Sequence, residues 1–253
     1  MNAITMNTSA TKAGNSWKWI YKLGAIMALI AMSANLADVI LGFGVTEMAT
    51  YSTKSTVEWF AVYQDSWFQG VYALGILNIV YMISMLPVYF ALFGAHYEKH
   101  ALATALTVTI FLTAMSMYIS NNAAIPLLTL SGKYSVASSE LERNILVAAG
   151  ESVLSRGEDF TAGSFIPLFL SGLAAICISI IMLRGGVFGK IHGWIGIVGF
   201  TLLSLFTIIA TFFPALYSFA FSFLASIGGL LALSWFALVA RRLFQLASNE
   251  ERR

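Results

Sequence analysis

Asp38 is the only charged residue in the first long apolar stretch of the chain, Leu23 to Phe43. A carboxylate inside a hydrocarbon layer is costly, so it requires a buried partner or a watery cavity and often marks a function. Small and polar residues recur with it at steps of three and four, and therefore share one helical face: Gly24, Ala28, Ala31, Asn35, Asp38 and Gly42. We expect this stripe to face other helices rather than lipid.

Several polar residues in later apolar stretches lie at a depth comparable to that of Asp38. At this depth the candidates for a proton, cation or ligand site with Asp38 and Asn35 are Gln69, Tyr72, Tyr118, Ser218 and Ser222, and a further candidate, Asn78, lies near the middle of the second span. No lysine or arginine falls inside a predicted span, and a buried carboxyl group without a counter-ion tends to hold a proton. The alternative is a structural hydrogen-bond hub, because hydroxyls and small side chains most often mark contacts between membrane helices.

The three histidines form a weaker candidate site. His96 and His100 are four residues apart and share a helical face, and His192 lies in the next loop on the same predicted side of the membrane. Imidazoles in such a group could hold a metal ion or a haem. Glu98 and Lys99 beside them favour an ordinary hydrated helix end, so we predict no cofactor.

The sequence lacks the short motifs of the common catalytic sites, including the P-loop, the serine elbow and H-E-x-x-H. It also lacks the basic clusters with interleaved aromatic residues that are typical of nucleic-acid binding. The histidines and most of the acids fall on opposite predicted sides of the membrane, which disfavours acid–base catalysis. Cys177 is the single cysteine, and within an apolar run it is expected to be a small buried hydrophobe.

The elements that position these residues are membrane helices. The 253 residues are 58% hydrophobic and only 10% charged, and the mean hydropathy is +0.80, values that exclude a soluble domain. A membrane-spanning helix needs ~20 apolar residues. We predict an all-α, integral membrane six-helix bundle over residues 17–246, with spans near 23–43, 67–95, 101–119, 161–183, 194–213 and 216–240.

Residues 121–160 are predicted to form an amphipathic helical cap on the extracytoplasmic side. Ser139 and Glu142 have the spacing of a capping box, and Gly157 is expected to end the helix that they begin. Its predicted apolar face contains Leu141, Ile145, Ala149 and Val153. The other non-membrane parts are predicted to be a disordered tail over 1–16, a loop from Val45 to Ser66 and a tail over 247–253.

The distribution of basic residues predicts the orientation. With six spans, ten lysines and arginines fall on the side of both termini and only four on the other side. Because flanking lysines and arginines stay cytoplasmic, both termini are expected in the cytoplasm, as in a multi-pass protein of the prokaryotic inner membrane.

Short motifs along the chain resemble an uncharacterised family of prokaryotic membrane proteins known only as a domain of unknown function. The motifs are Asp65-Ser-Trp-Phe-Gln, Gly-Ile-Leu-Asn78, Leu86-Pro87, Ala148-Ala-Gly-Glu151 and Ala240-Arg-Arg-Leu. The resemblance would cover Trp17 to Leu246. It implies a six-helix prokaryotic membrane protein and no activity or catalytic residue.

Three function classes remain open. The first is a non-enzymatic protein that acts as an accessory or sensory subunit, or that binds lipid or a small apolar ligand. The second is a secondary transporter of ions or small molecules, proton-coupled through Asp38. A membrane enzyme is third. The expected partners are the lipid bilayer and either another protein or further copies of the chain, but no nucleic acid.

Overall fold

The computed structural model describes residues 3–44 and 54–251, and every regular element within these ranges is helical. Five segments of the described chain are long and apolar enough to cross a membrane: Trp17–Ile40, Ile76–Val136, Glu140–Gly185, Lys190–Phe212 and Pro214–Asn249. The predicted all-α class and multi-pass membrane character are therefore confirmed. The long helices are α1 (Ala3–Gly44), α5 (Ile76–Asn121), α8 (Ala162–Gly185), α9 (Lys190–Phe212) and α11 (Ser226–Glu251).

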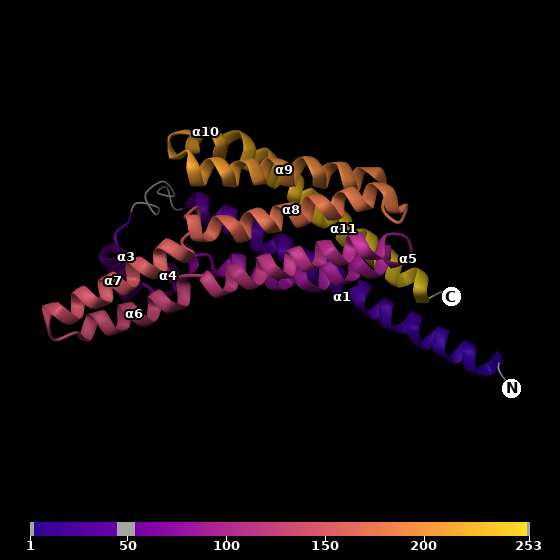
Figure 1. Cartoon of the computed structure of the whole chain (residues 1–253), viewed down its shortest axis with the longest axis horizontal. Coiled ribbons are helices and arrows are strands. Elements are labelled where there is room, and N and C mark those ends of the chain that lie inside the picture. Colours follow the sequence, from indigo (N-terminus) through magenta and orange to yellow (C-terminus); the bar gives the residue numbers. More distant parts are fainter. Residues whose placement is uncertain (1–2, 45–53, 252–253) are drawn as a thin grey trace.

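Helix α5 is two antiparallel arms that meet at His100, where the backbone leaves helical geometry (φ −138°, ψ 35°). The rings of Tyr89 and Phe111, one from each arm, stack with centroids 4.2 Å apart. At the far end of the two arms, the Asn122 side chain donates to the carbonyl of Leu74 over 2.9 Å. The arms lie side by side in Figure 1. The break predicted between residues 95 and 101 is thus present inside one continuous apolar segment.

Helix α1 packs against α5 and α11 through its small-residue stripe. Gly24, Ala28 and Ala31 are buried, whereas Leu23 and Ile30 on the other face are more than 40% exposed. A Cβ atom added at Gly24 would lie 2.6 Å from the Cβ of Ala91, so only glycine allows this approach. The prediction that the stripe faces other helices is confirmed for its described residues.

Helices α8 and α9 pack together, and α11 returns along α9 after a short turn. The turn contains a 3-10 segment (Pro214–Leu216), α10 (Tyr217–Ala220) and a π-helical segment (Phe221–Ala225). Gly199 and Gly228 meet at the α9–α11 contact, where an added Cβ at Gly228 would lie 3.0 Å from the Gly199 carbonyl oxygen. The π segment shifts the helical phase, and Ser218 and Ser222 are exposed.

Four shorter helices, which we call the cap, extend from one end of the bundle: α3 (Thr56–Asp65), α4 (Trp67–Ala73), α6 (Ala124–Val136) and α7 (Glu140–Gly157). The cap has its own core, separate from the bundle core, in which Trp59, Phe60 and Leu127 are fully buried. Both chain ends that the structure describes lie at the opposite end of the bundle, which we call the terminus end (Figure 1).

Two predicted irregular regions differ from the structure. Residues 3–16 were expected to be disordered but continue α1, and this stretch contains no proline to interrupt the helix. Residues 56–65 were expected in a loop but form α3, because Ser55 and Glu58 make a complete capping box. The predicted loop residues 45–53 lie outside the described residues.

The amphipathic helix predicted after Ser139 is present as α7 and ends at Gly157, but its buried face is not the predicted one. Leu141 and Ile145 are exposed, and the buried residues are Gly150, Leu154 and Gly157. The two glycines decide this rotation. An added Cβ at Gly150 would lie 2.3 Å from Thr56 Cγ2, so α7 turns its glycine face, rather than its largest side chains, toward α3.

Candidate functional site

Asp38 lies near the cap end of α1 and is half-buried. Tyr72 of α4 reaches it, but the Tyr72 hydroxyl donates to the main-chain carbonyl of Asp38, over 3.2 Å, and not to the carboxyl group. The carboxyl group instead lies within electrostatic range of the Tyr118 hydroxyl and of a second carboxyl group, Asp159. Asp38 is therefore part of a cluster formed by three separate elements.

Tyr118 is the centre of this cluster. It lies near the end of the second arm of α5, is only 3% exposed, and donates its hydroxyl to Asp159 Oδ1 over 3.3 Å. The side chain of Asn78, from the first arm of α5, also interacts with this hydroxyl. Asp159 accepts this hydrogen bond and Asp38 lies within electrostatic range, and two neighbouring carboxyl groups cannot both ionise freely because each charge repels the other.

The break between α4 and α5 fits closely around Tyr118. Gly75 occupies the left-handed region (φ +83°), and a Cβ atom there would lie 2.8 Å from the Tyr118 hydroxyl oxygen. Asn122 fixes the same corner, because its amide nitrogen donates to Leu74 and its amide oxygen accepts from the Ala124 nitrogen over 3.0 Å. Glycine is thus required at position 75 both by the backbone conformation and by the space that Tyr118 fills.

Asp159 is positioned by the loop that joins α7 to α8. The next residue, Phe160, has φ +63°, an uncommon backbone conformation for a residue other than glycine. Its ring packs on Phe206 and Tyr217 with centroids 5.2 Å and 6.0 Å away. Tyr217 is close enough to Asp159 to feel its charge. The anchored Phe160 ring therefore turns Asp159 back toward Tyr118.

Further acids connect this loop to the cap. Glu158 interacts with the indole of Trp59, and the Glu151 carboxylate accepts from the Thr56 hydroxyl over 2.7 Å. Arg156, the basic residue of this turn, donates to the amide oxygen of Asn121 over 3.2 Å. The cluster at Tyr118 can accordingly hold a proton or attract a small cation. Within the described ranges, no group of three or more histidine, cysteine or acidic residues has metal-binding geometry.

The structure unites only part of the predicted site. Asp38, Tyr72, Asn78 and Tyr118 meet at the junction of α1, α4 and α5. Asn35 donates to its own helix, at the Ala31 carbonyl, over 2.9 Å. The side chains of Gln69, Ser218 and Ser222 are exposed.

The histidines do not form one face. His100 sits at the turn of α5, whereas His96 is 1% exposed and neither of its ring nitrogens has a hydrogen-bond partner among the described residues. Phe188 separates His96 from His192, with ring centroids 5.5 Å from each. The prediction of a hydrated helix end is therefore wrong for His96, which Gly185 allows to pack tightly against the start of the α8–α9 loop.

Sequence reasoning missed Asp159 and Gly75. Asp159 was counted only as one of several acids on the cap side, and its sole distinguishing signal is its place directly before an apolar stretch. Gly75 interrupts a segment predicted as one span, and an isolated glycine is a weak signal of a break. Comparison with protein-family models, curated proteins and solved structures found no match to this chain.

Proposed function

We propose that this chain is a non-catalytic accessory or sensory subunit of a prokaryotic cytoplasmic membrane, which crosses the bilayer six times and docks a protein partner through its extracytoplasmic cap. The two arms of α5 support six crossings, because each arm runs the length of the bundle (Figure 1). The charge distribution supports the orientation. The turn of α5 next to Lys99 and the α8–α9 loop between Arg184 and Lys190 lie at the terminus end, near the basic residues of α11 (Figure 1).

The observation that carries the docking role is the exposed apolar tip of the cap. Val136 at the end of α6 is 80% exposed, and Leu141 and Ile145 on one face of α7 are 72% and 61% exposed. The α6–α7 hairpin extends along the long axis of the bundle, beyond the ends of α8 and α9 (Figure 1). Its tip therefore points away from the bilayer, where exposed apolar groups mark a protein interaction site.

The cap is also built to present this tip rigidly. The Tyr63 hydroxyl donates to the Ala124 carbonyl over 2.7 Å, and the Ser131 hydroxyl donates to the Phe60 carbonyl over 3.0 Å, both in buried positions. These bonds fix α6 on α3, while Glu151 fixes α7 on the start of α3. A preformed surface loses little conformational entropy when a partner binds.

Replacing Leu141 and Ile145 by glutamate tests this role. Both side chains are exposed, so the double variant should fold with a change of at most about 0.5 kcal/mol in stability. The native complex isolated from membranes should lose its partner, because charge is placed at the centre of the contact. Native mass spectrometry measures the mass of the complex.

The matched control is a Ser152→Glu, Ser155→Glu variant, which adds the same charges to exposed positions of the same helix. An unchanged complex in the Leu141, Ile145 variant contradicts docking at the tip. If the wild-type complex contains only copies of this chain, the tip mediates self-association and does not bind a different protein.

The cluster of Asp38, Tyr118 and Asp159 favours a second candidate function, proton-coupled transport. Its carboxyl groups lie at the junction of the bundle and the cap, and among the described residues no basic side chain contacts Asp159. A site that exchanges protons needs such a carboxyl group. Proton flux in variants of Asp159 and Asp38 separates this function from the docking role.

A further inference from the structure

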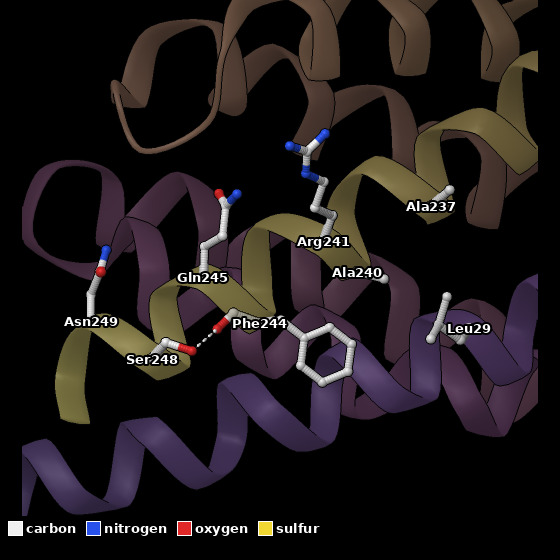
Figure 2. A pocket seen from close by; sticks show the side chains of 8 residues that line it. All are labelled: Leu29, Ala237, Ala240, Arg241, Phe244, Gln245, Ser248 and Asn249. Atoms are coloured by element: carbon white, nitrogen blue, oxygen red, sulfur yellow. Dashed lines mark hydrogen bonds between the residues drawn. The ribbon is translucent and has the colours of Figure 1, made fainter. Parts of the chain in front are cut away.

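A groove on the outer surface of the bundle runs between α1 and α11 near the terminus end. Its volume is about 620 Å³, and it is lined by Leu29, Ala237, Ala240, Arg241, Phe244, Gln245, Ser248 and Asn249 (Figure 2). We propose that this groove binds one phospholipid with an anionic headgroup, whose phosphate contacts Arg241 and whose acyl chain lies along Leu29 and Ala237.

The polar side of the groove is suited to a phosphate. Arg241 is exposed, and its guanidinium has no hydrogen-bond or ion-pair partner among the described residues. Figure 2 shows Arg241, Gln245 and Asn249 in one row along α11. A guanidinium matches the geometry of a phosphate with two parallel hydrogen bonds. Among the residues that the structure describes, none of those lining the groove is acidic, so none of them compensates the positive charge of Arg241.

The neighbouring Arg242 orients the side chain of Gln245 in this row. Arg242 donates through Nε to the Val187 carbonyl over 2.8 Å and through Nη1 to the Gln245 side-chain oxygen over 3.2 Å. The oxygen of Gln245 is thereby occupied, which leaves its amide hydrogens as donors. Arg242 is a positioning residue, held against the α8–α9 loop, whereas Arg241 remains available to a ligand.

The apolar and polar parts of the groove favour a lipid over a soluble anion as its ligand. Twelve residues separate Ala237 from Asn249, which is ~18 Å along a helix. Leu29, which is 38% exposed, lies beside Ala237 and Ala240 on the apolar part of this length, and the polar residues begin at Arg241 and continue toward the end of α11 (Figure 2). An acyl chain matches the first part and a headgroup matches the second.

The charge argues for an anionic lipid over a zwitterionic one. An uncompensated arginine attracts a headgroup of net negative charge and repels the ammonium group of a zwitterionic headgroup. Basic pockets between membrane helices on the cytoplasmic side are the usual binding sites of anionic lipids. The lipid site is distant from the cap. The test of lipid binding can therefore give a negative result while the test of partner docking gives a positive one, and the reverse.

The test uses the full chain in bicelles that contain equal amounts of phosphatidylglycerol and phosphatidylcholine. Native mass spectrometry of the released protein should show retained phosphatidylglycerol in excess over phosphatidylcholine. Arg241→Gln should lower this excess about tenfold, as expected for the loss of one charge-assisted contact. Lys190→Gln is the matched control, because it removes the same charge from an exposed position at the same end.

Three outcomes would overturn the proposal: equal retention of the two lipids, an equal loss in both variants, or full competition by inorganic phosphate. The last outcome would assign the site to a soluble anion. Circular dichroism confirms that Arg241→Gln is folded, and Gln245→Ala provides a second variant that keeps all charges and should weaken retention less than Arg241→Gln does.

Discussion

Asp159 and Tyr118 lie 41 residues apart in the sequence and share a hydrogen bond because three elements converge. Gly75 makes room for the Tyr118 hydroxyl, and Phe160 turns the backbone that carries Asp159. Asp38 adds a second carboxyl group from α1. The candidate site is therefore a product of loop geometry, not of one helical face.

The Asp159→Asn variant tests whether Asp159 exchanges protons or only supports the structure. Asp159→Asn keeps an oxygen that accepts from Tyr118, so stability should change by about 1 kcal/mol or less. The amide cannot exchange a proton, so proton flux into proteoliposomes, followed with a pH-sensitive dye, should be lost. Asp38→Asn should act in the same direction.

Asp65→Asn is the control for this experiment, because Asp65 is an exposed acid of the cap. Proton flux that persists in both site variants, or that is absent from the wild-type protein, refutes the transport candidate and leaves the cluster as a structural hub.

At the level of single residues, sequence reasoning located Asp38 and its neighbours Tyr72, Asn78 and Tyr118. A charge inside an apolar run is visible without a structure, because its cost depends only on the surrounding composition. The role of Asp159 was not visible, since it depends on a tertiary contact. Ser218 and Ser222 are exposed, and Ser222 lies in a π segment, where the regular helical spacing assumed from the sequence does not hold.

Helix α3 owes its beginning to the Ser55–Glu58 capping box. The Glu58 carboxylate accepts from the Ser55 backbone nitrogen over 2.6 Å and from the Ser55 hydroxyl over 2.8 Å, and these bonds lower the pKa of Glu58 below its ordinary value of 4.5. A lowered pKa means that the ionised group stabilises the folded helix above pH 4.5. The stabilisation is lost as the pH falls through the lowered pKa.

Glu58→Ala should therefore speed amide hydrogen exchange in the first turn of α3 several-fold at pH 7, after correction for intrinsic rates. The difference between variant and wild type should shrink in acid, where Glu58 is protonated. Gln64→Ala, an exposed change in the last turn of α3, serves as the control. A difference that does not depend on pH would show that the ionised carboxylate is not the stabilising group.

For helix α7, local sequence signals predicted the two ends, whereas the spacing of apolar residues did not predict the buried face. Its start at Ser139 and its end at Gly157 followed from local chemistry and were predicted correctly. The buried face was not, because a helix with few large apolar residues can be rotated by close backbone contacts. Gly157 makes such a contact, since an added Cβ would lie 2.0 Å from the Asn121 carbonyl oxygen.

At the scale of the whole molecule, the proposed six membrane crossings depend on counting each arm of α5 as one crossing. In a chain with Cys177→Ser and one added cysteine, Ser138→Cys in the cap should react with an impermeant maleimide on intact cells. Lys99→Cys and Lys190→Cys should react only after lysis, since both lie at the terminus end. Labelling of positions 99 and 138 together on intact cells would exclude six crossings in the proposed orientation.

The bundle as a whole was largely predictable because span length follows from bilayer thickness and composition. The cap was predicted only in part: helical structure was expected over 121–160, but the contribution of α3 and α4 was not, because these helices are short and their pairing depends on buried bonds such as that of Tyr63 to Ala124. The resemblance to an uncharacterised prokaryotic family stays a prediction.

The cap core and the bundle core are separate, which implies that different forces stabilise the two parts of the protein. In the proposed topology the cap core around Trp59 forms in water, so its stability carries a large heat-capacity change and falls in urea. The bundle core forms among lipid chains, where association rests on close packing and hydrogen bonds instead. Cooling and denaturant therefore weaken the cap before the bundle, and the cluster at Tyr118 lies at the boundary between them.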